Sequence, residues 1–489
     1  MNKLILAAAL LTGCGRDVPV LEPIIDVPPM TSPAYPYDTI DEISIAVARL
    51  GEDESIKGSR FEVGSPLVLP EIAFGQDLVV HMKGLSAGQE AAYGRTCAVT
   101  VTEDRMPPEN EPHLYFAGVP KWGISATPYE PTRSGGYAYT LPDGRAVFLG
   151  GQGSNGIERF DPQTGSFVRL DAALGAREKR VFAPLADGRV LVIGGVDGDG
   201  DGAALAELID PIPGVPTAAR RQEQDGPRLV DTSAVTLVDD TVLVAGGRVQ
   251  SAAGQPFVVT DLAWKLRVGD GGLLEPVEEL RVTMRTARAE HTATRLGNEP
   301  GADVLLIGGR DEAGLPVAGA ELYRPFRESF QPLDTATLNV PRWGHTAVRL
   351  AGGFVLVIGG FKPDPGGGDP LPVAELELYD PVDHAVRVVG MLPDDVGSSD
   401  FAFTELPDGR GLLVGGRGRD GKPVNTVRIV QFDAINGLVN LLGADGLGIA
   451  RAGHAAAQLC DGTILVTGGT VDPGEHQSER YNPLSDARR

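Results

Sequence analysis

The chain has 489 residues and a formal net charge of −23, with 65 glycines, 38 prolines and 42% hydrophobic residues. The hydrophobic content is enough for a large core, and the abundance of turn-forming residues argues against a coiled coil, a collagen and a disordered chain. The negative charge argues against nonspecific nucleic-acid binding, which needs a cationic surface, so we expect no nucleic acid among the partners.

The first predicted element is a short export signal. Lys3 precedes a continuous apolar run, Leu4–Leu11, that is too short to cross a bilayer as a helix. The run ends in Leu11-Thr12-Gly13-Cys14, which resembles the lipobox of bacterial lipoproteins. The resemblance implies a signal peptide over residues 1–13, cleavage before Cys14, and attachment of acyl chains such as palmitate to Cys14 as the membrane anchor. Because Gly15 rather than Asp follows, similarity to Gram-negative lipoproteins implies the outer membrane. A plain secretory signal with an accidental cysteine is the alternative.

Three segments are expected between the signal and the main body of the chain. Residues 14–38 are rich in proline and predict an extended tether. Residues 39–104 contain short alternating apolar runs separated by Gly and Asp, which predict a small, immunoglobulin-like β-sandwich. Residues 105–113 are a charged, proline-rich linker. Cys97 and Cys460 are 363 residues apart and fall in different predicted domains, so we expect two unpaired buried thiols and no disulfide framework.

Residues 114–489 are organised by a repeat. A Gly-Gly pair preceded by an apolar run recurs at 150–151, 194–195, 246–247, 308–309, 359–360, 415–416 and 468–469. A tight turn such as Pro142-Asp143-Gly144 precedes several of these runs and predicts a hairpin. After each pair, a variable loop leads to a third strand and a turn such as Tyr379-Asp380-Pro381, and then to a fourth strand. Four antiparallel strands per repeat of about 51 residues predict one propeller blade.

These repeats closely resemble the kelch family. The residues that carry the resemblance are Arg342-Trp343-Gly344-His345, Arg451-Ala452-Gly453-His454, the Gly-Gly pairs and the turns of the type Tyr-Asp-Pro. The resemblance implies that the chain is all-β, with a seven-bladed kelch-type β-propeller over 114–489 preceded by the small β-sandwich. Each Gly-Gly pair is expected to have positive φ beside a neighbouring backbone, where a Cβ would clash. His291, His345 and His454 share one repeat position and are expected to pack within the blades.

Ring closure is predicted from the spacing of the last repeat. Its third strand contains Tyr481, and too few residues follow for a fourth strand. In other repeats the apolar residue of the fourth strand lies 10 to 12 positions before the next arginine, and the position 11 before Arg133 is Trp122. We therefore expect 121–124 to pair beside 478–482, which would remove an exposed sheet edge.

A ligand site is predicted from an arginine that recurs before the first strand of six repeats. These residues are Arg133, Arg177, Arg228, Arg288, Arg342 and Arg451. On the kelch resemblance they would surround one mouth of the central channel, beside the long loops 248–256, 310–318 and 361–372. Guanidinium groups suit carboxylates, so an acidic peptide or an acidic sugar is the expected ligand. The alternative is that each arginine bonds backbone carbonyls between blades and serves packing.

A cation site is suggested by one acidic loop. Asp197, Asp199 and Asp201 alternate with glycines and resemble the first half of an EF-hand loop, so a structural Ca²⁺ is the one cofactor that the sequence suggests. Leu208 stands where such a loop would need a glutamate, and a solvated acidic loop is the alternative. Motifs that resemble dinucleotide-binding, phosphate-binding and nucleophile-elbow sequences lack the helix that their chemistry needs.

The sequence thus predicts a lipid-anchored protein of the cell envelope that binds a protein or glycan ligand and contacts the membrane only through its acyl chains. We favour binding over catalysis and identify no catalytic residue. The alternative is an exported carbohydrate-active enzyme, of the sugar isomerase or oxidase type, with its site at the propeller mouth. Both rest on resemblance at the level of the fold.

Overall fold

The computed structural model describes residues 2–4, 23–52, 57–65, 75–101, 112–129, 133–152, 154–203, 205–212, 220–269, 272–280, 282–470 and 478–484. Within these ranges the protein is all-β, and the only helical elements are two short 3-10 helices, η2 (Pro325–Arg327) and η3 (Ala351–Gly353). The lipobox residues Leu11–Cys14 lie outside the described residues. The all-β class expected from the turn-rich sequence is confirmed.

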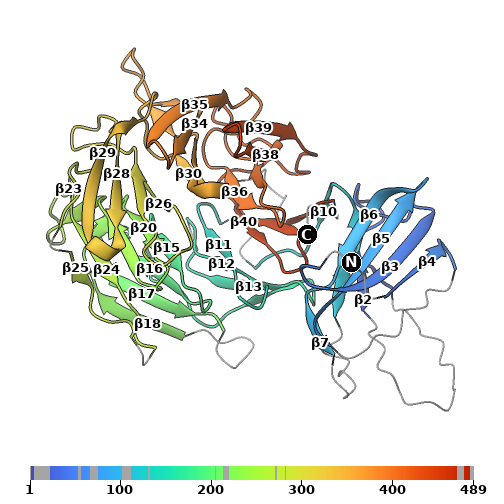
Figure 1. Cartoon of the computed structure of the whole chain (residues 1–489). Coiled ribbons are helices and arrows are strands. Elements are labelled where there is room, and N and C mark those ends of the chain that lie inside the picture. Colours follow the sequence, from blue (N-terminus) through green and yellow to red (C-terminus); the bar gives the residue numbers. More distant parts are fainter. Residues whose placement is uncertain are drawn as a thin grey trace.

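Two sheets form a small N-terminal β domain, drawn in blue in Figure 1. The first sheet has the order β1-β2-β8, with β1 (Asn2–Leu4), β2 (Ile24–Val27) and β8 (His113–Tyr115). The second has the order β4-β3-β5-β6-β9, with β7 beside β5; its strands are β3 (Glu42–Arg49), β4 (Lys57–Glu62), β5 (Gly75–Ser86), β6 (Gln89–Arg95), β7 (Val99–Val101) and β9 (Ala117–Gly118).

The core of this domain is contributed by both sheets. Alternate residues of β3, including Ile45 and Val47, pair with Met82 and Val80 of β5 and are shielded from solvent. Ile25 and Val27 of β2 pack into the same cluster. One face of each sheet is therefore buried against the other, as the alternating sequence pattern predicts; the immunoglobulin-like topology stays a prediction.

The domain boundaries differ from those expected. The predicted tether, 14–38, contains β2, and Ile25 and Ala34 within it are fully buried. The predicted start of the repeat region, residue 114, lies inside β8, and the repeat region begins with β10 (Lys121–Ile124) instead. Pro28 and Pro29 follow directly after β2, outside its hydrogen-bonded ladder, so proline content was compatible with a folded segment here.

Seven four-stranded antiparallel sheets make up the rest of the described chain. Sheets 1 to 3 contain β11 (Tyr137–Thr140), β12 (Ala146–Leu149), β13 (Ile157–Asp161) and β14 (Ser166–Arg169); β15 (Val181–Pro184), β16 (Val190–Ile193), β17 (Leu205–Asp210) and β18 (Arg220–Asp225); and β20 (Ser233–Thr236), β21 (Val242–Ala245), β24 (Ala263–Leu266) and β25 (Glu278–Glu279).

Sheets 4 to 7 follow in chain order. They contain β26 (Thr292–Arg295), β27 (Val304–Ile307), β28 (Gly319–Arg324) and β29 (Ser329–Thr337); β30 (Thr346–Arg349), β31 (Val355–Ile358), β34 (Glu375–Asp380) and β35 (Ala385–Met391); β36 (Ala402–Glu405), β37 (Gly411–Val414), β38 (Val427–Asp433) and β39 (Leu438–Gly443); and β40 (Ala455–Gln458), β41 (Ile464–Thr467), β42 (Glu479–Asn482) and β10. Loops add β19 (Leu229–Val230), β22 (Arg248–Gln250), β23 (Phe257–Val259), β32 (Phe361–Lys362) and β33 (Leu371–Pro372).

Each second strand is buried on both faces because it lies between two neighbouring sheets. In sheet 1, Val147 and Leu149 pack toward sheet 2, whereas Ala146 and Phe148 pack toward sheet 7. An apolar cluster joins every successive pair of sheets, and the last cluster joins sheet 7 to sheet 1. In Figure 1 the first strands lie toward the middle of this body and the fourth strands β18, β25, β29, β35 and β39 lie toward the outside. Continuous apolar runs are what two buried faces require.

The fourth strand of sheet 7 comes from the other end of the repeat region, as predicted. In the antiparallel pairing of β10 with β42, Lys121 is opposite Asn482 and Trp122 is opposite Tyr481. The two aromatic rings of the second pair lie 5.0 Å apart, and the indole Nε1 of Trp122 donates to the carbonyl oxygen of Asp445 at 2.9 Å. The predicted pairing of 121–124 with 478–482 is therefore confirmed.

The Gly-Gly pairs have the conformation that the sequence led us to expect, since all fourteen glycines have positive φ. A Cβ on Gly246 would lie 2.6 Å from the carbonyl oxygen of Arg288, and one on Gly309 would lie 2.7 Å from that of Ala289. No side chain can occupy these positions without moving the backbone that leads into a first strand.

The cysteine prediction was wrong, because Cys97 and Cys460 form a disulfide with their Cα atoms 5.1 Å apart. Cys97 follows β6 of the small domain, and Cys460 lies in the turn between β40 and β41. Sequence separation gave no hint of this contact, which arises because the small domain packs against sheet 7.

Candidate functional site

The arginines predicted to bind a ligand are not at the surface, with one exception. Five of them are buried and each pairs with a buried glutamate of the third strand in its own sheet. The pairs are Arg133–Glu158, Arg177–Glu207, Arg288–Glu321, Arg342–Glu377 and Arg451–Glu479. Arg228 is partly exposed and donates to the carbonyl oxygen of Gly202. The expectation that these arginines line a ligand-binding mouth is therefore wrong for the five buried ones.

The guanidinium of Arg342 shows how fully such a group is used within its own sheet. It donates to the Glu377 carboxylate at 2.6 Å and to the backbone carbonyl oxygens of Val340, Gly359 and Glu375 at 2.8–3.2 Å. Burial lowers the pKa of Arg342, and the charge of Glu377 partly opposes this effect. The carbonyl bonds agree with the packing alternative, although they lie within one sheet rather than between sheets.

Two sheets lack the pair, and in both of them each partner is replaced. In sheet 3, Leu229 takes the arginine position. The third residue of the second strand, which is paired with the glutamate in the sheets that contain the pair, is paired here with Trp264, so Trp264 takes the glutamate position. Leu229 and Trp264 pack in one apolar cluster. In sheet 6, Ser398 and Arg428 take the two positions. Neither sheet therefore retains one charge of the buried pair without the other, which would carry a large desolvation penalty.

The repeated histidines are internal, as predicted. His291 and His345 share hydrogen bonds of 2.9 Å with Ser233 and Thr292, which belong to the first strand of the preceding sheet. Burial and the nearby arginines lower the pKa of His345 and of His454 to about 3 and that of His291 well below its ordinary value. These side chains are therefore neutral, and His291 and His345 link neighbouring sheets.

A set of strained backbone positions, which the sequence did not predict, lies where the chain enters each first strand. We call it the αL ring: the residue two positions before every first strand has φ between 52° and 67°. Its members are Gly135, Lys179, Asp231, Glu290, Gly344, Asp400 and Gly453. Four of them are not glycine, and such strain in non-glycine residues is often found at functional sites.

Main-chain hydrogen bonds connect members of the αL ring across neighbouring sheets. The N–H of Gly135 donates to the carbonyl oxygen of Gly453, and the N–H of Gly453 donates to that of Asp400. In the same way, the N–H of Glu290 donates to the carbonyl oxygen of Asp231, and the N–H of Gly344 donates to that of Glu290. The distances are 2.7–2.9 Å. The backbone of these residues is therefore held at fixed positions beside the first strands.

Three arginines outside the predicted set pair with the acidic members of the αL ring. Each one directly follows a Gly-Gly pair. The ion pairs are Arg248–Asp231 at 3.8 Å, Arg310–Glu290 at 2.6 Å and Arg417–Asp400 at 2.8 Å. Lys179 lies 3.7 Å from Asp231 as well. The triplet Gly-Gly-Arg, which occurs three times at this repeat position, is the sequence signal that could have identified the cluster.

Aromatic side chains adjoin this charged cluster. The guanidinium of Arg310 lies 5.6 Å from the ring centre of Trp343, which is buried and whose backbone forms a β-bridge with the partly exposed Phe361. The Glu290 carboxylate is partly buried, and this burial together with the charge of Asp231 raises its pKa. The cluster therefore combines paired charges, an apolar flank and one carboxyl group with an altered affinity for protons.

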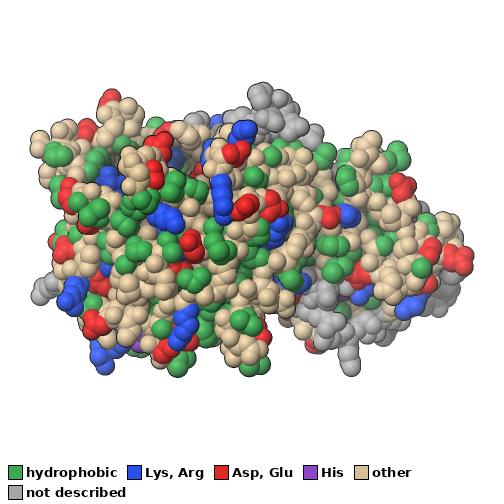
Figure 2. Space-filling view, turned by 90° about the horizontal axis from the view of Figure 1, so that it is seen from above, with side chains coloured by type: hydrophobic (Ala, Val, Ile, Leu, Met, Phe, Trp, Pro, Cys, Tyr) green, Lys and Arg blue, Asp and Glu red, His purple; other side chains and the backbone are tan. Residues whose placement is uncertain are grey.

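Charges of both signs alternate in this cluster, so it is not a region of one sign. Figure 2 likewise shows, on the face that it presents, Lys and Arg side chains interspersed with Asp and Glu. An acidic ligand would have to compete with the carboxylates that already accept from the arginines.

The acidic loop is stabilised by its own hydrogen bonds. The Asp197 carboxylate accepts from the backbone N–H of Asp199 and Asp201, and the Asp201 carboxylate accepts from Gln250 and Gly254. Among the residues that the structure describes, no group of three or more His, Cys, Asp or Glu side chains is placed to hold a metal ion. The calcium expectation stays a prediction.

None of the helices in the described ranges is long and apolar enough to cross a membrane. No protein-family model matches the chain, and no curated protein matches it. It is similar to a solved structure described as "Structure of YjhT", with a TM-score of 0.49 and 13% identity, covering 65% of this chain and 99% of that one. A likeness of this size carries no argument about function.

Proposed function

We propose that the protein is a lipid-anchored binding protein of the cell envelope, whose seven sheets are the blades of a closed kelch-type propeller. The ligand site is the αL ring with its three arginines, at one end of the central opening, and the ligand is a glycan or a protein that carries similar polar groups. The observation that carries the proposal is the repeated pairing of a Gly-Gly-Arg arginine with a strained acidic residue.

The contacts between sheets support the propeller. Apolar clusters follow one another from sheet 1 to sheet 7 and then return to sheet 1. The pairing of β10 with β42 joins the two ends of the repeat region. Closure of this kind removes free sheet edges, which is the usual reason for such architecture.

Two independent features support export. The lipobox at Leu11–Cys14 predicts processing and acylation at Cys14. The Cys97–Cys460 disulfide is of a kind that persists in oxidising compartments and is rare in the cytosol. An outer-membrane lipoprotein satisfies both.

The paired charges favour a glycan over an acidic peptide. A sugar hydroxyl can accept from an arginine and donate to the neighbouring carboxylate, so it can bind without separating the pair. A carboxylate ligand would have to displace Asp231, Glu290 or Asp400 from an arginine. Phe361, which is partly exposed, adds an apolar flank of the kind that the faces of sugar rings contact.

The test is a glycan-binding screen with the purified full chain. We expect Arg310→Ala and Arg417→Ala to weaken capture of the selected glycan at least tenfold while leaving the melting temperature within about 2 °C. Arg387→Ala is the matched control, because Arg387 is an exposed arginine of β35 that pairs with Asp383. Unchanged binding in both αL-ring variants, or selection of an acidic peptide instead, would contradict the glycan assignment.

One observation favours the alternative of a carbohydrate-active enzyme. Burial and the charge of Asp231 raise the pKa of Glu290, which is the direction that a general acid needs. If the bound sugar changes its anomeric or isomeric form, nuclear magnetic resonance will detect the product, and Glu290→Gln will abolish turnover but retain binding.

A further inference from the structure

The disulfide lies where three parts of the molecule meet. Cys97 belongs to the small domain, and Cys460 belongs to the turn of the first hairpin in sheet 7. The backbone N–H of Cys460 donates to the carbonyl oxygen of Gly144, in the corresponding hairpin of sheet 1, at 3.3 Å. The bond therefore joins the small domain to the seam between the last sheet and the first.

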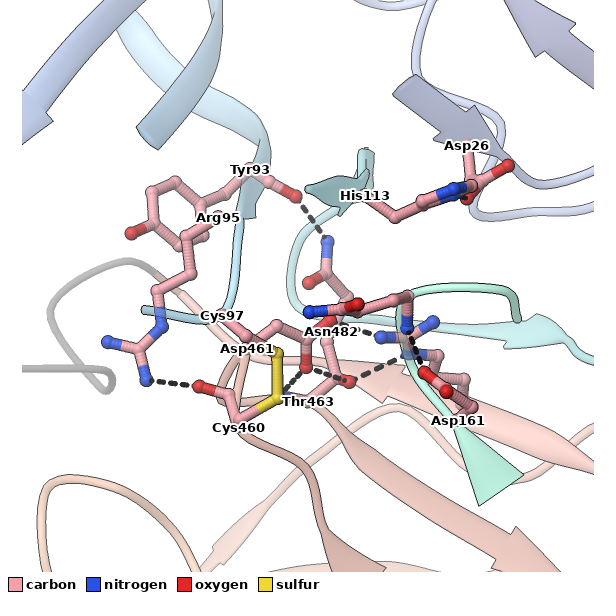
Figure 3. Close-up of polar contacts among 12 residues, drawn as sticks. Asp26, Tyr93, Arg95, Cys97, His113, Asp161, Cys460, Asp461, Thr463 and Asn482 are labelled. Atoms are coloured by element: carbon pink, nitrogen blue, oxygen red, sulfur yellow. Dashed lines mark hydrogen bonds and ion pairs between the residues drawn. A yellow bond between two sulfur atoms is a disulfide. The ribbon is translucent and has the colours of Figure 1, made fainter. Parts of the chain in front are cut away.

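Polar contacts surround this bond (Figure 3). Arg95 donates to the carbonyl oxygen of Cys460 at 3.1 Å, and the Asn482 side chain donates to the carbonyl oxygens of Tyr93 and Ala117 at 2.7–2.8 Å. These contacts all cross between the small domain and sheet 7.

A buried arginine completes the interface. Arg480 of β42 donates to Thr463 at 2.7 Å and pairs with Asp461, while its guanidinium lies 4.2 Å from the ring centre of Tyr115 in the small domain. Asp461 directly follows Cys460 in the chain, so the disulfide and the ion pair act on the same short turn.

We propose that the Cys97–Cys460 disulfide is a redox-dependent latch that holds the small domain against the seam and thereby keeps β10 paired with β42. β10 follows the small domain directly and is the one strand of sheet 7 that comes from that side of the chain. Release of the small domain therefore pulls on the strand that closes the seam.

The chemistry balances with a dithiol as the reductant. Its two sulfurs form a disulfide and supply two electrons and two protons, the Sγ–Sγ bond breaks, and Cys97 and Cys460 become thiols. Cys97 is only 7% exposed. Cys460 is partly exposed, so a dithiol can approach the bond from the side of sheet 7 while the small domain is still docked.

The test compares the oxidised full chain with the chain treated with dithiothreitol, by hydrogen exchange. Reduction is expected to speed exchange of the amides of β10 and β42 at least tenfold and to leave β27 and β31, in the distant sheets 4 and 5, unchanged. Nonreducing digestion should yield one peptide pair linked through Cys97 and Cys460.

Cysteine variants supply the controls. Because one disulfide needs both sulfurs, Cys97→Ser, Cys460→Ser and the double variant should all exchange like the reduced protein, and dithiothreitol should not affect any of them further. Alkylation of both thiols in the untreated native protein would overturn the proposal. Equal exchange of β10 in the oxidised and reduced proteins would overturn it as well.

Discussion

The Arg342 guanidinium and the Glu377 carboxylate are 2.6 Å apart, and both side chains are completely shielded from solvent. The same relationship recurs in four other sheets, whereas sheet 3 has Leu229 and Trp264 in its place. Removing one partner of such a buried pair lowers stability strongly, because the remaining charge loses its compensation. Replacing both partners by apolar side chains need not lower stability, because no buried charge remains.

We expect Arg342→Leu to lower the free energy of unfolding by about 3–5 kcal/mol, because Glu377 is left as an uncompensated buried charge. Denaturant unfolding measures the loss. The double variant Arg342→Leu with Glu377→Trp, which copies sheet 3, should lose less than Arg342→Leu alone. Arg387→Leu removes an exposed ion pair and should change stability by less than about 1 kcal/mol. A double variant that is less stable than the single one would contradict this account.

Stability should fall with acidity below pH 6.5. The folded-state pKa of His345 and of His454 is about 3, below the ordinary 6.5 of the unfolded chain, so the unfolded state binds more protons between these values. Each histidine contributes up to about 1.4 kcal/mol per pH unit in that window. His345→Gln, which retains a donor toward Thr292, should flatten the dependence of the melting temperature on pH between 6.5 and 4.

Trp122→Ala should weaken the closure of sheet 7. Trp122 is buried against Tyr481 and donates to the carbonyl oxygen of Asp445, so its removal leaves a cavity and breaks this hydrogen bond. We expect a loss of about 3–5 kcal/mol in the free energy of unfolding. Tyr129→Ala removes an aromatic side chain that is 61% exposed and serves as the control. Equal, small losses in the two variants would show that β10 contributes little.

Cys14→Ser should abolish acylation and leave an unprocessed or soluble product. A serine hydroxyl cannot form the thioether that carries the acyl chains, and these chains supply the expected membrane anchor. Detergent phase partitioning and the mass of the N-terminal peptide measure the change. Normal processing with unchanged partitioning would show that the lipobox assignment is wrong.

Calcium binding by the loop of Asp197 can be tested by calorimetry on the full chain. If the loop holds the ion, Asp199→Ala should abolish the heat, because Asp199 is exposed and its carboxylate is available as a ligand. The absence of heat at millimolar calcium would retire the assignment.

The second strands could be predicted because a strand that is buried on both faces is a continuous apolar run, and here each such run ends in Gly-Gly. Trp122 could be placed because a repeat fixes the interval between a fourth strand and the next arginine. Both inferences need only local pattern and counting.

The environment of the arginines could not be obtained in this way. Arg342 and Glu377 are 35 residues apart, and only the register of the third strand brings them together. Arginine is usually exposed, so the sequence favoured a surface role for a residue that is buried here. The disulfide was missed for a related reason, because it depends on how two domains pack and not on any spacing within one.

The partnership of β10 with β42 also sets the order in which the molecule can be completed. Translation at about 5–20 residues per second separates the emergence of Trp122 from that of Tyr481 by roughly 20–70 seconds. Throughout this interval the first strand of the pair has no partner, and its backbone can pair with other nascent chains. Deletion of the last ten residues removes most of β42 and leaves β10 permanently without its partner. We therefore expect such a truncated chain to aggregate during synthesis rather than to fold into a less stable monomer.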